Sequence, residues 1–132
     1  MFNHTNEEKK KYLELYLKQR RKWDRLVKKK EELKEKNKKY NVDIELSDLL
    51  EEIDKRIQTV ATRTELYEFK LDLIIIDLPY PMDEIFKLKF KKGYTFEQIR
   101  DEICFSERTI YRYYSKAMDM FDLNELKNIF SK

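Results

Sequence analysis

Two arginines, Arg108 and Arg112, lie four residues apart in the last third of the sequence, in a segment that Ser106 opens. On an α-helix this spacing places both side chains on one face. An arginine can donate two parallel hydrogen bonds to O6 and N7 of guanine, so an exposed pair of this kind suits the major groove of DNA. As an alternative, the two arginines are solvated surface residues or pair with Glu107 or Asp119.

The helix that carries these arginines is expected to have one apolar and one polar side. It begins after Ser106, a good N-cap, and continues to about Met120. Ser106 could also hold a phosphate, because helix N-termini bind phosphates through their amides. The expected core residues are Ile110, Tyr113, Tyr114, Ala117 and Phe121, which leaves Tyr111 free to stack. The residues expected to contact DNA are Ser106, Glu107, Arg108, Thr109, Tyr111, Arg112 and Lys116.

Two shorter helices are expected before this one. The first runs from Met82 to Lys92 and ends at Gly93, where a helix C-cap needs a positive φ. The second is Phe96–Ile103, which Thr95 caps and a buried turn residue, Cys104, follows. Two helices joined by a short turn form a helix-turn-helix. Candidate phosphate contacts, which could equally be a solvated helix end, are Lys91, Lys92 and Thr95.

The sequence from Thr95 to Met118 resembles the helix-turn-helix of sigma-70 region 4. It is more closely similar to phage late-gene transcriptional regulators of the ArpU/RinA type. Those regulators contain Ser-x-Arg-Thr-hydrophobic-Tyr-Arg, here residues 106–112, and a Lys-Ala-hydrophobic ending, here residues 116–118. The resemblance covers about a third of the chain, residues 80–121. It implies that the bases are read by Arg108, Thr109 and Arg112.

Two positions depart from the pattern of these helix-turn-helix units. Arg100 stands where a small residue is usual, so it either splays the two helices or extends its charge into solvent. Cys104 stands in the turn, where glycine is common. Both departures concern the geometry of recognition rather than the fold.

Two long helices are expected before the helix-turn-helix. The first extends from Asn6 to Tyr40, residues 41–46 connect, and Ser47 caps the second, which Pro79 and Pro81 end. A seven-residue apolar repeat of this length predicts a seam that packs on the first helix, on a second chain or on both. Its members are Leu46, Leu50, Ile53, Ile57, Val60, Thr64, Tyr67, Leu71, Ile74 and Leu78.

Charge is unevenly distributed along the chain. Residues 1–40 hold 15 Lys and Arg against 7 Asp and Glu, whereas residues 41–78 hold 4 against 10. Residues 79–132 are nearly neutral, with 10 against 9. This asymmetry favours antiparallel packing of a basic helix on an acidic one. The basic helix could instead contact DNA or a protein partner.

The composition excludes several classes of protein. The 132 residues include 1 Gly and 2 Pro, too few for a many-stranded sheet, and 1 Cys and 1 His, His4, which exclude a disulfide framework and a Cys/His metal site. Neighbouring glutamates such as Glu51 and Glu52 diverge on a helix, so no catalytic constellation is evident. No apolar run is long enough to span a bilayer. We expect a non-enzyme without metal or cofactor, in the cytoplasm of a bacterial host cell.

These observations predict an all-α protein with a long antiparallel, coiled-coil-like helical hairpin at residues 1–78 and a sigma-70 region 4-like DNA-binding unit at residues 79–132. The expected function is regulation of transcription in a phage or mobile element through double-stranded DNA, with a homodimer and RNA polymerase as candidate partners. One alternative is a helical interaction module that engages polymerase or another protein without reading bases. Another is the DNA-recognising small subunit of a packaging motor, although that subunit usually places its DNA-binding unit first.

Overall fold

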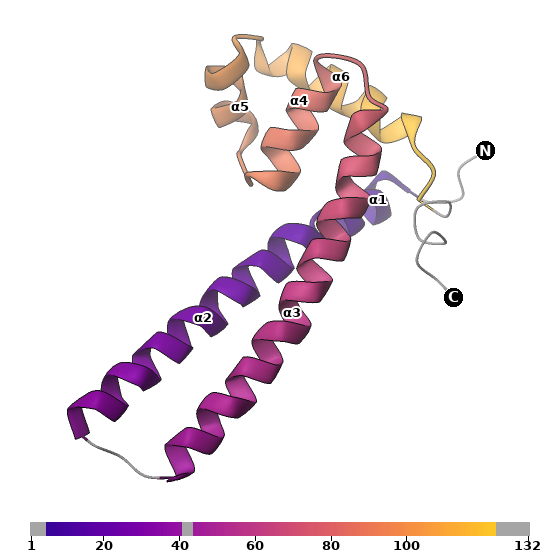
Figure 1. Cartoon of the computed structure of the whole chain (residues 1–132). Coiled ribbons are helices and arrows are strands. Elements are labelled where there is room, and N and C mark those ends of the chain that lie inside the picture. Colours follow the sequence, from indigo (N-terminus) through magenta and orange to yellow (C-terminus); the bar gives the residue numbers. More distant parts are fainter. Residues whose placement is uncertain (1–4, 41–43, 124–132) are drawn as a thin grey trace. The chain divides into compact units, whose positions relative to one another are not determined.

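Every regular element that the computed structural model describes, over residues 5–40 and 44–123, is a helix (Figure 1). The all-α prediction is therefore confirmed. His4 and the start of the expected connection, Asn41, lie outside the described residues. The elements are α1 (Asn6–Leu13), α2 (Leu15–Tyr40), α3 (Ile44–Ile76), α4 (Met82–Phe86), the π-helix η1 (Lys87–Lys91), α5 (Phe96–Ile103) and α6 (Glu107–Met120).

Residues 18–66 of α2 and α3 form one compact unit, here called the arm. The two helices run antiparallel, side by side (Figure 1), and Lys30 Nζ lies 2.6 Å from Asp54 Oδ1 across them. Thr64 is the one polar member of the seam, and its buried hydroxyl donates to the Val60 carbonyl at 2.7 Å. The predicted hairpin is confirmed, and all seam residues of the arm are buried or half-buried: Leu46, Leu50, Ile53, Ile57, Val60 and Thr64.

Two helix boundaries differ from the expectation. The first long helix is interrupted at Glu14, which separates α1 from α2. Glu14 itself keeps a right-handed helical conformation, with φ −76° and ψ −10°, and both Lys9 and Leu13 of α1 are buried. The third helix begins at Ile44, so Ser47 lies inside it and caps nothing. An earlier start adds the buried Leu46 to the helix, and apolar burial outweighs the capping preference of a serine.

The second compact unit, here called the core unit, comprises the chain up to Leu17 and from Tyr67 onward. Its boundaries differ from the predicted division after residue 78, because the last turns of α3 and the first helix supply part of its core. Phe86 lies fully buried with its ring centroid 5.1 Å from that of Phe90 and 5.9 Å from that of Tyr114. The principal core residues are Leu13, Tyr16, Leu71, Ile74, Leu78, Met82, Ile85, Phe86, Leu88, Phe90, Ile99, Ile110, Tyr114, Ala117 and Met118.

The helix expected over Met82–Lys92 is present as α4 followed by the π-helix η1. In η1 the Lys92 amide donates to the Lys87 carbonyl at 3.2 Å, a bond that spans five residues. Gly93 follows with a φ of 73°, as predicted for a position that only glycine occupies without strain. The wide turn buries both Leu88 and Phe90 in the core.

Candidate nucleic-acid interface

Helices α5 and α6 form the predicted helix-turn-helix, and each begins with a side-chain cap. Thr95 Oγ1 accepts from the Gln98 amide at 3.2 Å, and Gln98 Oε1 accepts from the Thr95 amide at 2.8 Å. This reciprocal pair is a capping box. Ser106 Oγ accepts from the Thr109 amide at 3.2 Å and donates to Thr109 Oγ1 at 2.9 Å. The predicted caps are confirmed, and they fix where both helices begin.

The turn between these helices passes through Cys104, which has a φ of 60°. This left-handed conformation ends α5, the role that glycine usually has. The sequence-based expectation that Cys104 is buried is wrong, because its side chain is exposed. At this position the backbone reverses away from the core, so the side chain projects toward solvent.

Helix α6 separates its apolar and basic residues onto different faces. Ile110, Tyr114 and Ala117 are buried against the rest of the core unit. The residues on the outward face include the three cations Arg108, Arg112 and Lys116, which follow one another at intervals of four. All three are exposed, and none forms an ion pair within the part of the chain that the structure describes. The result is a continuous basic row along the exposed face of α6.

Tyr113 supports this basic row. Tyr113, which is expected in the core, packs against the core at its edge and is half-buried. The guanidinium of Arg112 and the ammonium of Lys116 lie over its ring. The distances to the ring centroid are 5.6 Å from Arg112 Cζ and 5.9 Å from Lys116 Nζ. A cation over an aromatic face is attracted to it while its donors stay available. The arrangement orients two cations without neutralising them.

Tyr111 is not free to stack, contrary to the expectation from the sequence. Its ring is 55% exposed, but its centroid lies 4.5 Å from that of Phe96 on α5. Phe96 in turn packs edge-on against Tyr114 at 5.1 Å, and Lys89 Nζ lies 4.6 Å from its centroid. Tyr111 therefore joins the two helices of the helix-turn-helix through Phe96, while more than half of it stays exposed.

Lys91 is engaged in ion pairs within the core unit and is not a free phosphate contact. Its ammonium lies 2.8 Å from Asp72 Oδ1 and 3.6 Å from Glu68 Oε2, both on α3. Burial opposes the charge of Lys91, but the bond to Asp72 and the two carboxylate charges outweigh burial and raise its pKa. Of the other two candidates, Lys92 is exposed beside the Tyr94 ring and Thr95 is exposed as a cap.

Arg100 extends outward and gathers carboxylates around the turn. Its guanidinium lies 3.1 Å from a Glu107 oxygen, 3.2 Å from Asp101 and 3.7 Å from Glu97. Of the two alternatives for Arg100, the structure shows the one in which its charge extends into solvent. Glu107 is thereby held by Arg100, which leaves Arg108 without a carboxylate partner among the described residues. The sequence did not indicate this cluster, because its members come from two helices.

Lys9 positions the far end of α6, a role that sequence reasoning missed. Its side chain is buried, with 1% exposed, and Nζ donates to the Met118 carbonyl at 2.6 Å. That carbonyl belongs to the last turn of α6, where a cation complements the helix dipole. Burial lowers the pKa of Lys9, and nearby Asp119 partly offsets the effect. No local signal marks Lys9, which stands in a run of three lysines.

Tyr114 makes the core unit sensitive to alkaline pH. Burial and, less strongly, the neighbouring Tyr111 raise the pKa of its phenol from 10.0 to about 12. The unfolded chain ionises this phenol first, so stability that is present below pH 10 falls as the pH rises to about 12. Over that range we expect wild-type protein to lose on the order of 1–2 kcal/mol more than Tyr114→Phe. Urea unfolding of both proteins across this pH range measures the difference, and parallel losses would contradict the assignment.

The structure holds no group of three or more His, Cys, Asp or Glu residues arranged for a metal ion within residues 5–40 and 44–123. None of the helices described there is long and apolar enough to cross a membrane. Comparison of the chain with protein-family models, with curated proteins and with solved structures gives no significant match.

Proposed function

We propose that the protein is a transcriptional regulator that binds double-stranded DNA through α6. The observation that carries the proposal is the exposed row of Arg108, Arg112 and Lys116 on a helix whose opposite face is buried. A helix of this kind fits the major groove, and α5 crosses the backbone beside it. The resemblance of residues 106–118 to ArpU/RinA-type regulators supports the finer assignment to a phage or mobile element.

In this mechanism the residues of α6 have separate tasks. Arg108 and Arg112 donate to guanine O6 and N7, and the ring of Tyr113 holds Arg112 in place from behind. Lys116 contacts a phosphate further along the helix, and Lys92 contacts one on the other side. The free amides of the first turn of α6, after Ser106, can receive another phosphate. Lys9 and the core maintain the angle at which α6 is presented.

Arg112→Ala is expected to cost about 1–3 kcal/mol of binding on the specific site and much less on random DNA. The specific site is the sequence that the wild-type protein enriches from a random duplex library. Competition binding at constant salt measures both losses, and circular dichroism verifies the fold. Ser115→Ala, an exposed residue on the same helix, is the matched control. Equal losses on specific and random DNA would make Arg112 a phosphate contact and would contradict base reading.

A second candidate function is a protein-interaction module that contacts RNA polymerase or another protein without reading bases. The carboxylates around Arg100 favour this alternative, because Glu97, Asp101 and Glu107 lie at the turn where DNA would approach. The near-neutral charge of residues 79–132 also favours it. If folded Arg112→Ala lost no affinity for any DNA, this alternative would replace the DNA-reading proposal.

The proposal includes a homodimer, since a second copy would double the number of phosphates contacted. The exposed Leu49 and Leu66 on α3 of the arm offer apolar surface for a second chain. Dimeric regulators bind two half-sites about one helical turn apart. A dimer therefore predicts a selected DNA sequence with two-fold symmetry.

A further inference from the structure

Helix α2 carries a basic stripe along the arm that α3 does not neutralise. The stripe consists of side chains at three- and four-residue intervals, with one gap of seven, so all of them point in nearly the same direction. All are exposed, and four of them have no ion pair within the part of the arm that the structure describes, the exception being Lys29 with Glu32 at 3.7 Å. The members of the stripe are Lys18, Lys22, Arg25, Lys29 and Lys36.

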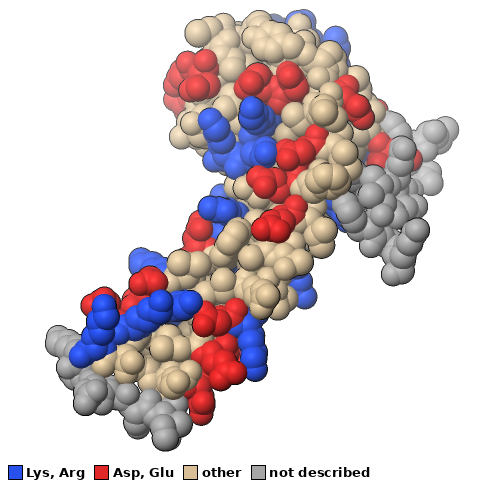
Figure 2. Space-filling view, viewed as in Figure 1, with Lys and Arg blue, Asp and Glu red and all other residues tan. Residues whose placement is uncertain are grey.

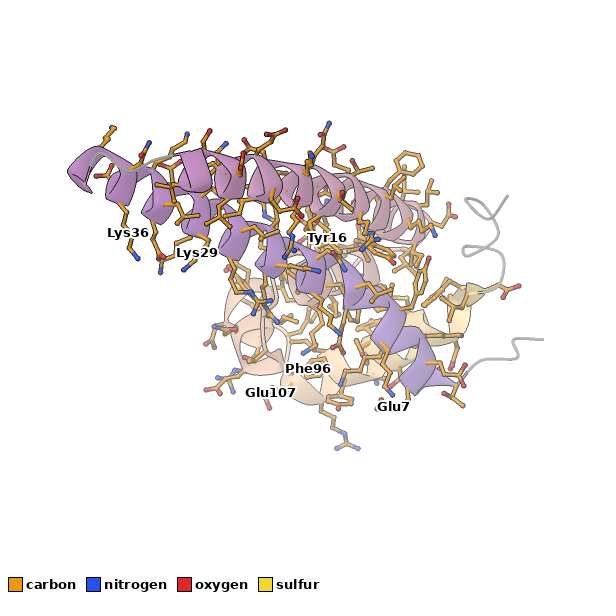
Figure 3. All side chains as sticks on the ribbon, turned by 90° about the horizontal axis from the view of Figure 1, so that it is seen from below. Glu7, Tyr16, Lys29, Lys36, Phe96 and Glu107 are labelled. Carbon is orange, nitrogen blue, oxygen red and sulfur yellow. The ribbon has the colours of Figure 1, made fainter. Side chains whose placement is uncertain are left out.

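Part of the stripe points away from the partner helix, whereas Lys22 lies beside it. Figure 3 shows Lys29 and Lys36 pointing from α2 to the side opposite α3. Within the described residues of the arm, the ion pair that joins α2 to α3 is that of Lys30 with Asp54, and Lys30 lies outside the stripe. Glu51 and Glu52 of α3 pair instead with cations of their own helix. The surplus positive charge of α2 is thus presented to solvent, and packing on acidic α3 does not account for it.

Positive charge continues from the stripe into a groove between the two helices of the arm. The groove has a volume of about 410 Å³, and Lys22 borders it from α2. Arg63 borders it from α3, and neither of these two cations has an ion pair within the described arm. Figure 2 shows basic side chains on the visible face of the arm, with acidic side chains next to them. The remaining lining residues are Leu26, Glu52, Lys55, Arg56, Thr59 and Val60.

We infer that this stripe and groove form a second DNA contact, one that binds the phosphate backbone of a duplex without regard to sequence. From Lys18 to Lys36 the stripe is about 27 Å long, at about 1.5 Å per residue. Its cations recur about every 5–6 Å, and a DNA strand carries a phosphate about every 3.4 Å along the axis. Flexible lysines can follow such a line of charges. The inference concerns a site separate from the base-reading row of α6.

A polyanion fits this surface better than a protein partner does. Lysine is depleted at protein interfaces, where aromatic and apolar anchors provide most of the affinity. Four of the five residues in the stripe are lysines, and none of the five is aromatic or aliphatic. The phosphate backbone needs no such anchor, because released counterions drive its binding. The choice of DNA as the polyanion rests on the proposed function, in which α6 already binds duplex DNA.

The test replaces the four unpaired cations of the stripe together: Lys18→Gln, Lys22→Gln, Arg25→Gln and Lys36→Gln. The probe is a random-sequence duplex of about 30 base pairs, titrated at several salt concentrations. Each lost phosphate contact lowers the slope of log affinity against log salt by about 0.9, so we expect the slope to fall by about 3–4. The ratio of affinities for specific and random DNA is expected to stay within about twofold, because discrimination depends on α6.

The matched control removes charge from three cations of α2 that already hold a carboxylate and lie outside both the stripe and the groove: Arg20→Gln, Lys30→Gln and Lys34→Gln. The control is expected to lower the slope by less than about one. Circular dichroism establishes that both variants keep a helical arm. An unchanged slope in the folded stripe variant would overturn the inference, and so would an equal fall in the control.

A parallel titration with polyglutamate separates DNA from an acidic protein partner. A stripe variant that loses polyglutamate binding but keeps duplex binding would overturn the inference in favour of an acidic protein. Failure of this inference can be told apart from failure of the proposed function. That function fails when the wild-type protein shows no preference for any DNA sequence, whereas this inference fails when the salt slope stays unchanged.

Discussion

Phe86→Ala is expected to lower the free energy of unfolding of the core unit by about 3–5 kcal/mol. The side chain is 0% exposed, and the rings of Phe90, Tyr114 and Phe121 surround it with centroid distances of 5.1, 5.9 and 6.4 Å. Three rigid rings cannot collapse into the space that a lost phenyl group leaves. The cavity therefore adds to the lost transfer free energy. Urea unfolding followed by tyrosine fluorescence measures the loss.

Ile76→Ala serves as the control for Phe86→Ala, since its side chain is 79% exposed and it also shortens an apolar residue to alanine. The control is expected to change stability by less than about 0.5 kcal/mol. Because Phe86 packs directly on Tyr114, its loss also loosens α6 and should weaken binding to all DNA. A Phe86→Ala protein of wild-type stability would contradict the position given to the core.

Val60→Asp is expected to destabilise the arm by about 3–5 kcal/mol, because it places an unpaired charge in a buried seam. Val60 is 3% exposed and lies in the part of α3 that belongs to the arm. Lys22 and Arg63 border the groove that Val60 also lines, but both are exposed, so a carboxylate buried at Val60 loses its hydration without gaining a buried partner. The ellipticity of the helices during thermal unfolding measures the effect, and the arm is expected to melt before the core unit.

Thr62→Asp provides the comparison for Val60→Asp, two residues further along the same helix. Thr62 is exposed, so its replacement tests the helix propensity of aspartate without burial of charge. We expect it to cost less than about 1 kcal/mol. Similar losses in both variants would show that the seam does not run through Val60.

The features that the sequence predicted are those that local periodicity and capping chemistry determine. The heptad positions from Leu46 to Leu78 all proved buried or half-buried. Thr95 and Ser106 cap the helices that they were expected to cap, because a hydroxyl at this position satisfies an amide three residues on. These interactions join residues that are close in sequence, so a single chain reveals them.

The features that the sequence did not predict depend on contacts between distant segments. Lys9 meets the Met118 carbonyl 109 positions away, and Lys91 meets Asp72 on another helix. From the sequence alone, Lys91 is indistinguishable from a solvent-exposed lysine, because its partner Asp72 is 19 positions away. The sequence also did not predict the interruption at Glu14. It directly follows Leu13, which is buried by residues that are distant in the sequence. Of the candidate site, the basic row on α6 was predictable, and the environment that leaves its cations free was not.

Selection from a random duplex library directly tests whether α6 reads DNA sequence. Wild-type protein and the double variant Arg108→Gln, Arg112→Gln are each put through the same rounds of binding and amplification. We expect the wild type to enrich a sequence with guanines at fixed positions. The double variant is expected to retain duplexes but to lose the preference for those guanines. A wild-type pool that remains as random as the starting library would contradict the claim.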